Sequence, residues 1–367
     1  MEQVLLALQT AAGMLWKAFW ALVFGYIVSA AIQVMISRKQ MGRALGERGI
    51  ERIALAGFLG TVSSSCSFAA LATSRSVLVK GAHPVNAVAF LVASTNLVVE
   101  LGVVLFVLLG WEFFVGNLLL GVLIIVYVYL LTACWFPDKL AKIAREHAGR
   151  TQEADGSGRD GQGDERSWRL LASNEGWEAI ADAFVMEWKM VYKEILFGFT
   201  VAGFISVFVP VGFWDSLFLE SGADAPSFLA VLENALVAPL VAFFTFIGSM
   251  GNVPLAAMLW SKNSSFGGVM AFLGADLVAA TVVWVHAKYY GWRYAMYLSA
   301  LLYVGMVAAG VSVHYLFAAV GRLPTTRPSL EEMVRFEIDY TFWLDVAFGL
   351  IGGILLYLHC REKRESR

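Results

Sequence analysis

Two apolar stretches are interrupted by polar residues: IALAGFLGTVSSSCSFAALATSRSVLVK at residues 53–80 and ALVAPLVAFFTFIGSMGNVPLAAMLWSK at residues 235–262. Each is long enough to cross a membrane, but its centre holds small and polar residues that weaken a helix. These are Ser63, Ser64, Ser65, Cys66 and Ser67 in the first stretch, and Gly248, Ser249, Met250, Gly251, Asn252 and Pro254 in the second. Non-helical backbone at membrane depth is tolerated only where protein buries it or where it lines a watery cavity. Both stretches are therefore predicted to be broken or re-entrant helical hairpins at a site.

The rest of the chain has the composition of a membrane protein. Of its 367 residues 59% are hydrophobic and 15% charged, whereas about one quarter of a soluble domain is charged. Runs of about 20 apolar residues are long enough to cross a hydrocarbon core about 30 Å thick. They predict full spans at 15–37, 85–109, 113–136, 194–214, 266–287, 293–317 and 341–360. No separate soluble enzyme domain is expected, and a net charge of −2 gives no indication of a nucleic-acid partner.

The distribution of Lys and Arg predicts which connections share a side of the membrane. Basic clusters follow the first span, the span that ends near residue 136 and the last span, whereas the connection 215–227 has acidic residues but no Lys or Arg. Cytoplasmic connections carry more Lys and Arg than outer ones. All three basic clusters can therefore be cytoplasmic only if each interrupted stretch enters and leaves the membrane on the same side. The N-terminus is then expected outside a bacterial inner membrane and the C-terminus in the cytoplasm. Four basic residues oppose this assignment, since they would lie outside: Lys262, Arg322, Arg327 and Arg335.

The two halves of the chain resemble each other. Each interrupted stretch ends in a Lys, which a short polar turn and a helix follow, NAVAFLVAS at 86–94 and GVMAFLGAD at 268–276. Residues 146–173 between the halves are polar, Gly-rich and aperiodic, which predicts a disordered linker. The expected fold is an all-α polytopic membrane protein with two inverted-topology repeats, each with full spans and a broken or re-entrant hairpin, and an extra C-terminal span. The expected divisions are 1–136 (first repeat), 137–189 (polar, partly disordered cytoplasmic linker), 190–317 (second repeat) and 318–367 (outer loop, last helix and basic tail).

Polar groups inside the predicted spans are candidates for ion coupling. Asn96 and Glu100 are four residues apart and are expected on one helix face, and Asp276 lies in the matching helix of the second half. A carboxylate at membrane depth is costly unless it is paired, protonated or hydrated, so a functional role is the first hypothesis. Glu100 and Asp276, reached by a central cavity, could carry protons or ions in an exchange cycle. The alternative is that Glu100 forms a structural ion pair with Arg75.

The two interruptions are candidates for solute binding. A Cys66 thiolate is a soft ligand for As(III), Hg(II) or Cu(I), Met250 offers a thioether, and Asn252 can hydrogen-bond a solute. The alternatives are close packing of half-helices through small residues and a purely structural turn. The expected solute-binding residues are Ser63 to Ser67, Asn96, Ser249 to Asn252 and Pro254. The three cysteines, Cys66, Cys134 and Cys360, lie too far apart to predict a disulfide framework or a structural zinc site, and no cofactor is expected.

The segments SSSCSFAALATSRSVLVKGAHPVNAVAFLVASTNLVVELG (63–102) and GSMGNVPLAAMLWSKNSSFGGVMAFLGADLV (248–278) resemble the predicted-permease family that includes the bacterial organoarsenical efflux permeases. The resemblance implies a permease that exports a small solute, with trivalent organoarsenicals as the known example. The resemblance implies that an arsenical exporter relies on cysteine thiols, and this chain has only Cys66 at membrane depth. The expected partners are membrane lipid and a small-molecule or metalloid solute, and a homodimer is left open.

A secondary transporter, and not an enzyme, is the leading hypothesis for function. The sequence contains no GxxxxGK[ST] motif, so ATP could drive transport only through another chain. An intramembrane enzyme that uses Cys66 or Glu100 is the first alternative, although no His is obviously placed to act as its base. A structural subunit of a membrane complex is the second.

Overall fold

The computed structural model describes residues 2–35, 49–63, 67–134, 137–154, 173–219, 226–245, 248–327 and 340–365. All regular structure in these residues is helical. Among the described residues, six helical segments are long and apolar enough to cross a membrane: Glu2–Ala31, Trp111–Cys134, Val191–Phe208, Phe266–Tyr290, Trp292–Ala319 and Thr341–Arg361. The pair Pro84–Asn96 and Val99–Leu109, bent by 43°, is a seventh if it counts as one span. The protein is a multi-pass, all-helical membrane protein.

The predicted spans overlap helices, but two helices begin earlier than predicted and the helix of the predicted span 194–214 ends at Phe208. α1 (Glu2–Met35) starts well before residue 15, because no Gly or Pro interrupts its first turns and Ala7 and Ala11 pack against Gly203. α9 (Asn174–Phe208) starts 20 residues before 194, since Ser173 caps its N-terminus by accepting a hydrogen bond from the Gly176 N–H. α7 (Trp111–Cys134), α15 (Trp292–Ala319) and α17 (Tyr340–Glu365) lie close to the predicted bounds.

Two predicted spans are broken at their centres. The first consists of α5 (Pro84–Asn96) and α6 (Val99–Leu109), and between them Val98 has an extended backbone (φ −97°, ψ 147°). One cause is the side-chain amide of Asn117 in α7, which donates to the Asn96 carbonyl at 2.7 Å and so competes for the oxygen that an unbroken helix would bond to the Glu100 N–H. The prediction that Asn96 and Glu100 share one helix face is therefore wrong, because they belong to different helices.

The second broken span consists of α13 (Phe266–Leu273), the 3-10 helix η2 (Gly274–Val278) and α14 (Ala280–Tyr290). Ala279 between η2 and α14 has an extended backbone (φ −54°, ψ 145°). Asp276 thus lies in a 3-10 turn just before the break and not in a continuous α-helix, as Asn96 lies just before the break in the first half.

Each interrupted stretch forms two short helices. The first contains α3 (Ile50–Ser63) and α4 (Ser67–Val79), and the second α11 (Phe228–Thr245) and α12 (Ser249–Ser261). Both helices of each pair pack against the helix that follows them, α5 or α13. The end of α12 returns close to α11, since Asn234 Oδ1 accepts a hydrogen bond from the Ser265 N–H at 2.9 Å.

The predicted linker is partly helical. Residues 146–154 belong to α8 (Asp138–Ala154), and 155–172 lie outside the described residues. The prediction of an aperiodic segment from 146 onwards is wrong for α8, because alanines at helical spacing, Ala141, Ala144 and Ala148, are buried there. Arg145 donates to the Ala82 carbonyl at 2.7 Å, which ties α8 to the turn between α4 and α5.

The turn between α4 and α5 and the turn between α12 and α13 lie at opposite ends of α15. α8 also contacts the end of α14, where His147 Nδ1 lies 3.1 Å from the Tyr289 carbonyl, next to the start of α15. The turn between α12 and α13 lies at the other end, since the rings of Phe266 and Phe317 are 5.1 Å apart. α15 has 28 residues, so these ends are about 42 Å apart at 1.5 Å per residue.

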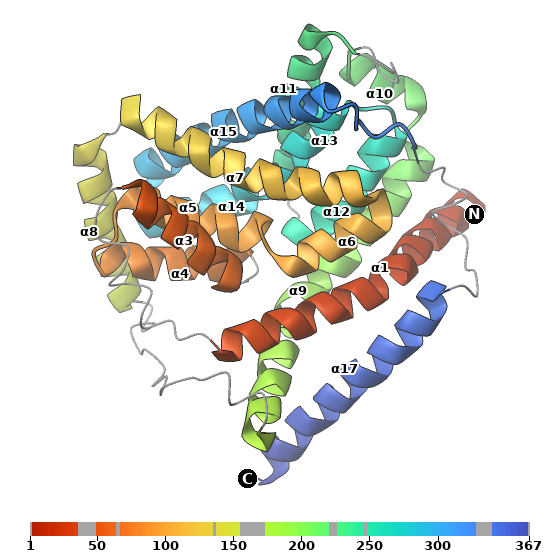
Figure 1. The fold of residues 1–367 in the computed structure, drawn as a ribbon, viewed down its shortest axis with the longest axis horizontal. Coiled ribbons are helices and arrows are strands. Elements are labelled where there is room, and N and C mark those ends of the chain that lie inside the picture. The colour runs from red at the N-terminus through yellow and green to blue at the C-terminus, as the bar shows by residue number, and fades with distance from the viewer. Residues whose placement is uncertain are drawn as a thin grey trace.

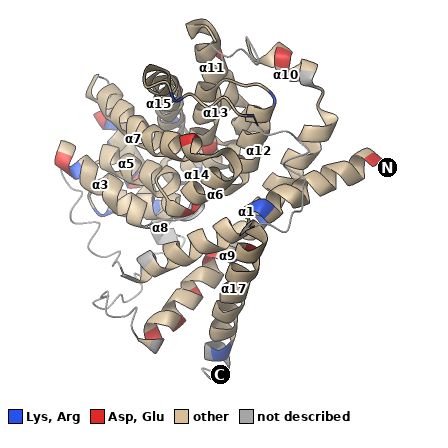
Figure 2. Ribbon diagram, turned by 45° about the vertical axis from the view of Figure 1, so that its right-hand side comes forward, with Lys and Arg blue, Asp and Glu red and all other residues tan. Residues whose placement is uncertain are grey.

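α1, α9 and α17 form a group of long helices beside the broken helices (Figure 1). Aromatic pairs join α1 to α17, for example Trp20 and Phe348 at 6.2 Å between ring centroids. Small residues let α1 approach α9 closely at Gly203. Figure 2 shows long stretches of α7 and α17 without a charged side chain, as expected for surfaces that face lipid.

Candidate functional site

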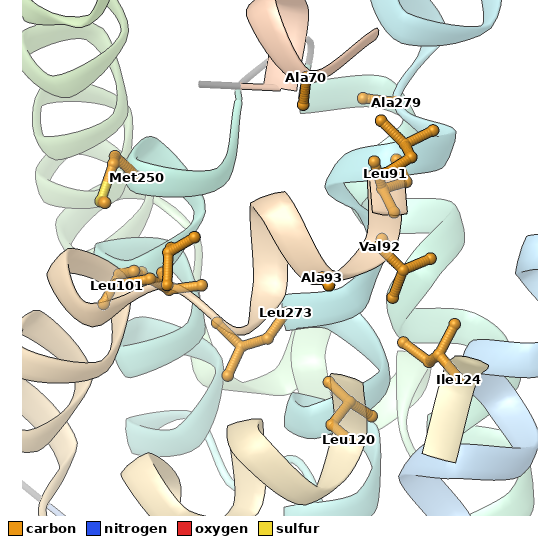
Figure 3. Close-up of a cluster of buried hydrophobic side chains, with 14 of the residues drawn as sticks. Ala70, Leu91, Val92, Ala93, Leu101, Leu120, Ile124, Met250, Leu273 and Ala279 are labelled. Atoms are coloured by element: carbon orange, nitrogen blue, oxygen red, sulfur yellow. The ribbon is translucent and has the colours of Figure 1, made fainter. Parts of the chain in front are cut away.

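Four helix ends meet in the interior of the protein. α12 contacts α6, and α4 contacts α14, so the second helix of each interrupted stretch reaches the broken span that follows the other stretch. In Figure 3, Met250 at the start of α12 points toward Leu101 of α6, and Ala70 near the start of α4 lies beside Ala279. The starts of α4 and α12 and the two helix breaks therefore belong to one region, which we call the central site.

Ser249 and Asp276, both predicted from the sequence, are in direct contact. The Ser249 hydroxyl at the first turn of α12 donates a hydrogen bond to Asp276 Oδ2 in η2. The Asp276 side chain is 1% exposed. Gly248, the residue before α12, provides no side-chain cap, so the first amides of this helix have no partner from that position. The contact joins α12 to the second broken span.

Asn252 lies one helical turn after Ser249 and is completely buried. Neither its amide nitrogen nor its amide oxygen has a hydrogen-bond partner in the part of the chain that the structure describes. An unsatisfied buried polar group costs about 1–3 kcal/mol, so its presence calls for a reason other than stability. Pro254, in the same helix, has no N–H to bond the Met250 carbonyl four residues earlier, so this carbonyl lacks its usual helical partner.

Glu194 of α9 also reaches the central site, although the sequence did not single it out. A Cβ atom on Gly248 would collide with Glu194 Oε2, so the carboxyl group lies directly over the start of α12. It is close enough to Asp276 for their charges to interact. Glu194 stands at the first position of the predicted span 194–214, where a carboxylate normally faces water. The sequence signal that could have identified Glu194 is a carboxylate directly before a long apolar run.

The polar residues of the first break are arranged differently. Asn96 is fully buried, with its side-chain nitrogen donating to Thr95 Oγ1 at 3.1 Å and no partner for Oδ1 among the described residues. Glu100 is 3% exposed in the first turn of α6, where the positive end of the helix dipole stabilises a carboxylate. Its backbone packs against Gly25 of α1, because a Cβ there would lie 2.5 Å from the Glu100 Cα.

The first interruption is described only in part. Ser63 ends α3 and is 5% exposed. Ser64, Ser65 and Cys66 lie outside the described residues, and Ser67 begins α4 without a described side chain. Solute binding by these residues, and a metal or metalloid on Cys66, stay predictions. The described part of the chain contains no cluster of three or more His, Cys, Asp or Glu side chains that could hold a metal ion.

The fold and the central site together define a class of protein. Apolar helices cross most of the structure, and two of the spans break where buried polar side chains gather. Discontinuous helices around a buried polar centre are typical of secondary transporters. The protein is thus a membrane transporter by class.

Comparison with known proteins gives the family. The chain belongs to the predicted-permease family, whose sequence pattern matches residues 3–315. Rv2963, named as a candidate permease of Mycobacterium tuberculosis (strain ATCC 25618 / H37Rv), is 38% identical over 331 residues, which are 88% of this chain and 80% of that protein. No solved structure matches the chain. The resemblance noted in the sequence is confirmed, and it points to a transporter and not to an enzyme.

Proposed function

We propose that the protein is a secondary transporter that exports a small solute across a bacterial inner membrane through the central site. The observation that carries this proposal is the buried, unpartnered amide of Asn252 at the start of α12. A solute with a hydrogen-bond donor or acceptor would satisfy this amide, and the hydrogen bond gained in this way is then a source of binding energy.

We further propose that α3–α4 and α11–α12 are re-entrant hairpins in two repeats of inverted topology. The support is that their following turns lie at opposite ends of α15 and that α12 returns to the Asn234 region of α11. Cytoplasmic connections carry more Lys and Arg than outer ones, so the basic residues that follow α1, α7 and α17 favour the cytoplasm for the end of the protein that contains α8. The N-terminus then lies outside. On the outer side, Arg327 donates to the Trp260 carbonyl at 2.8 Å, which gives this outward-facing arginine a structural role.

A soft metalloid species, such as a trivalent organoarsenical, is the proposed solute class. Met250 is 7% exposed in the first turn of α12 and offers a soft thioether ligand, and Cys66 would add a thiolate from the other hairpin. Glu100 and Asp276 are the proposed coupling groups for exchange against protons or another ion. Their burial makes a net charge costly, so ion binding and release would favour different conformations.

Flux measurements in proteoliposomes test the proposal. The variants are Asn252→Leu and Ser65→Leu, each of which replaces a polar group of a hairpin tip, and the control is Ser216→Leu on the exposed part of α10 (Val211–Leu217). Uptake of methylarsenite, arsenite, Hg(II) and Cu(I) into inside-out vesicles is compared at equal protein content. Both tip variants are expected to lower the flux of the carried solute at least about tenfold, which corresponds to the loss of about 1.4 kcal/mol of binding. If neither variant changes the flux, the solute passes elsewhere.

A further inference from the structure

The side chains of Asn96 and Asn117 meet at the break between α5 and α6. Asn117 lies in α7, and its Nδ2 donates to the Asn96 backbone carbonyl at 2.7 Å. The Asn96 side chain leaves α5 toward the same face of α7, because a Cβ on Gly121, one turn after Asn117, would lie 3.4 Å from the Asn96 Cβ. Both asparagine side chains are completely buried. Two uncharged carboxamides therefore lie together between α7 and the end of α5.

The unsatisfied atom of each carboxamide is its oxygen. Asn96 Nδ2 donates to the Val92 carbonyl at 3.4 Å and to Thr95 Oγ1 at 3.1 Å. Because a carbonyl oxygen only accepts hydrogen bonds, the contacts with carbonyls fix which end of each carboxamide is the nitrogen. Neither Oδ1 has a hydrogen-bond partner in the part of the chain that the structure describes. Asn117 Oδ1 lies within about 5 Å of the Asn96 carbonyl oxygen, since the two end atoms of a carboxamide are about 2.3 Å apart.

The end of α5 adds backbone oxygens at the same place. The last hydrogen bond at this end of the helix runs from the Leu97 N–H to the Ala93 carbonyl. The carbonyls of Ser94 and Thr95, which follow, therefore have no intrahelical donor. Carbonyls at a helix C-terminus also carry the negative end of the helix dipole. Side-chain and backbone oxygens with partial negative charge thus border the break.

Oxygen atoms of this kind favour a small monovalent cation as ligand. In membrane proteins, carbonyl oxygens replace the hydration shell of such an ion, and the C-terminal ends of broken helices coordinate Na⁺. A divalent cation is normally bound through carboxylates, and Asn96 and Asn117 are uncharged. The space is narrow, because a Cβ on Gly121 would lie 2.6 Å from Leu97 Cδ2. Such close packing leaves room for an ion and not for a larger solute.

We propose that Asn96 Oδ1 and Asn117 Oδ1, with the backbone carbonyls at the end of α5, bind one Na⁺ ion, which is exchanged for the exported solute. Glu100 is the one ionisable residue in the sequences of α5 and α6, and it is buried in the first turn of α6 on the other side of the break. Its carboxylate offsets the charge of the ion without having to contact it. The ion joins α5 to α7, so its release loosens this contact and lets the break move. The exchange rests on the proposed transport function, whereas the ion site itself does not.

Binding of radioactive Na⁺ to the purified protein tests the site without any solute. The wild-type protein in choline chloride is expected to bind one Na⁺ per chain, and unlabelled Na⁺ should displace it. Asn96→Leu and Asn117→Leu each remove one oxygen ligand and should weaken binding at least about tenfold. The control is Thr132→Val, a nearly isosteric change at another buried polar residue of α7, whose hydroxyl bonds only within its own helix. It should bind Na⁺ as the wild type does.

Thermal unfolding in detergent shows whether a variant that does not bind Na⁺ is still folded. At equal ionic strength, Na⁺ in place of choline should raise the unfolding temperature of the wild type and of Thr132→Val, because an ion that binds only the folded state stabilises it. Both asparagine variants should unfold cooperatively and show no such increase. Absence of Na⁺ binding by the wild-type protein overturns the proposal, whatever the variants do. Wild-type affinity in both asparagine variants also overturns it, because the ion then lies elsewhere.

Transport in proteoliposomes separates this proposal from the proposed function. The probe is methylarsenite in inside-out vesicles, with the membrane potential held at zero by K⁺ and valinomycin. A Na⁺ concentration about tenfold higher inside should support about tenfold accumulation for one-for-one exchange, and Asn117→Leu should lose it. Accumulation driven by a pH gradient and independent of Na⁺ overturns the exchange with Na⁺ but leaves transport intact. Na⁺ binding that both asparagine variants lose, with no flux of any tested solute, contradicts the proposed function alone.

Discussion

Asn252→Leu should make the protein more stable and less active at the same time. The side chain is completely buried, and both atoms of its amide are unpartnered among the described residues. Leucine has nearly the same shape and no polar atom to desolvate. Removing the penalty of an unsatisfied buried group should raise the free energy of unfolding by about 1–3 kcal/mol. Residues that bind a ligand commonly reduce stability in this way.

Asn234 of α11 provides a matched control, because it is a buried asparagine whose amide is fully bonded. Its nitrogen donates to the Ala230 carbonyl at 2.8 Å and to the Leu219 carbonyl at 3.2 Å, and its oxygen accepts from the Ser265 N–H at 2.9 Å. Asn234→Leu removes these bonds and leaves the Ser265 N–H unpaired. It should lower the free energy of unfolding by about 2–4 kcal/mol. The same chemical substitution thus has opposite signs at the two positions.

The assay is unfolding in detergent micelles followed by the fluorescence of the 12 tryptophans, together with flux in proteoliposomes. The expected order of stability is Asn252→Leu, then wild type, then Asn234→Leu, and Asn252→Leu should lose flux despite its greater stability. If Asn252→Leu unfolds more easily than the wild type, its amide makes structural hydrogen bonds, and the argument for a binding role fails.

Three further substitutions test the packing and charge of the fold. Gly198→Ala should lower the free energy of unfolding by about 1–3 kcal/mol, because its Cβ would lie 2.5 Å from the Gly251 Cα and α9 would have to move away from α12. An unchanged melting temperature would show that the two helices are not in such close contact. Arg327→Ala removes the hydrogen bond to the Trp260 carbonyl and a guanidinium 4.1 Å from the Trp260 ring centre. Proteolysis of the connection between α15 and α17 should therefore become faster, and an unchanged rate would count against this anchoring. Burial lowers the pKa of Lys262 from its ordinary 10.5, so the unfolded chain binds the proton more readily and folding is penalised below the lowered pKa. Lys262→Met should therefore raise the free energy of unfolding at pH 7, and this increase should become smaller as the pH approaches 10.5. Denaturation of both proteins at pH 7 and near pH 10.5 measures the increase. An increase that is equal at the two pH values would contradict the reasoning.

Much of the helical layout could be predicted because it depends on local sequence. An apolar run long enough to cross a membrane stays helical wherever it lies, since its backbone groups must bond to one another in lipid. The same logic locates the breaks after Ser63 and before Ser249, where small and polar residues weaken the helix. The pairing of Ser249 with Asp276 was not predicted, although both residues were selected by their polarity.

The sequence by itself determined the class of the protein, the approximate positions of the spans and several of the buried polar residues, among them Asn96, Asn252 and Asp276, because hydrophobicity and helix-breaking residues act over a single turn or span. Only the tertiary structure decided which of those residues meet. The break at Val98 depends on Asn117 from another helix, which takes the Asn96 carbonyl and separates Asn96 from Glu100. Glu194 reaches the start of α12, next to the Ser249–Asp276 contact, because Gly248 leaves room for its carboxyl group. Contacts of this kind depend on packing between helices distant in sequence, and no local pattern encodes them.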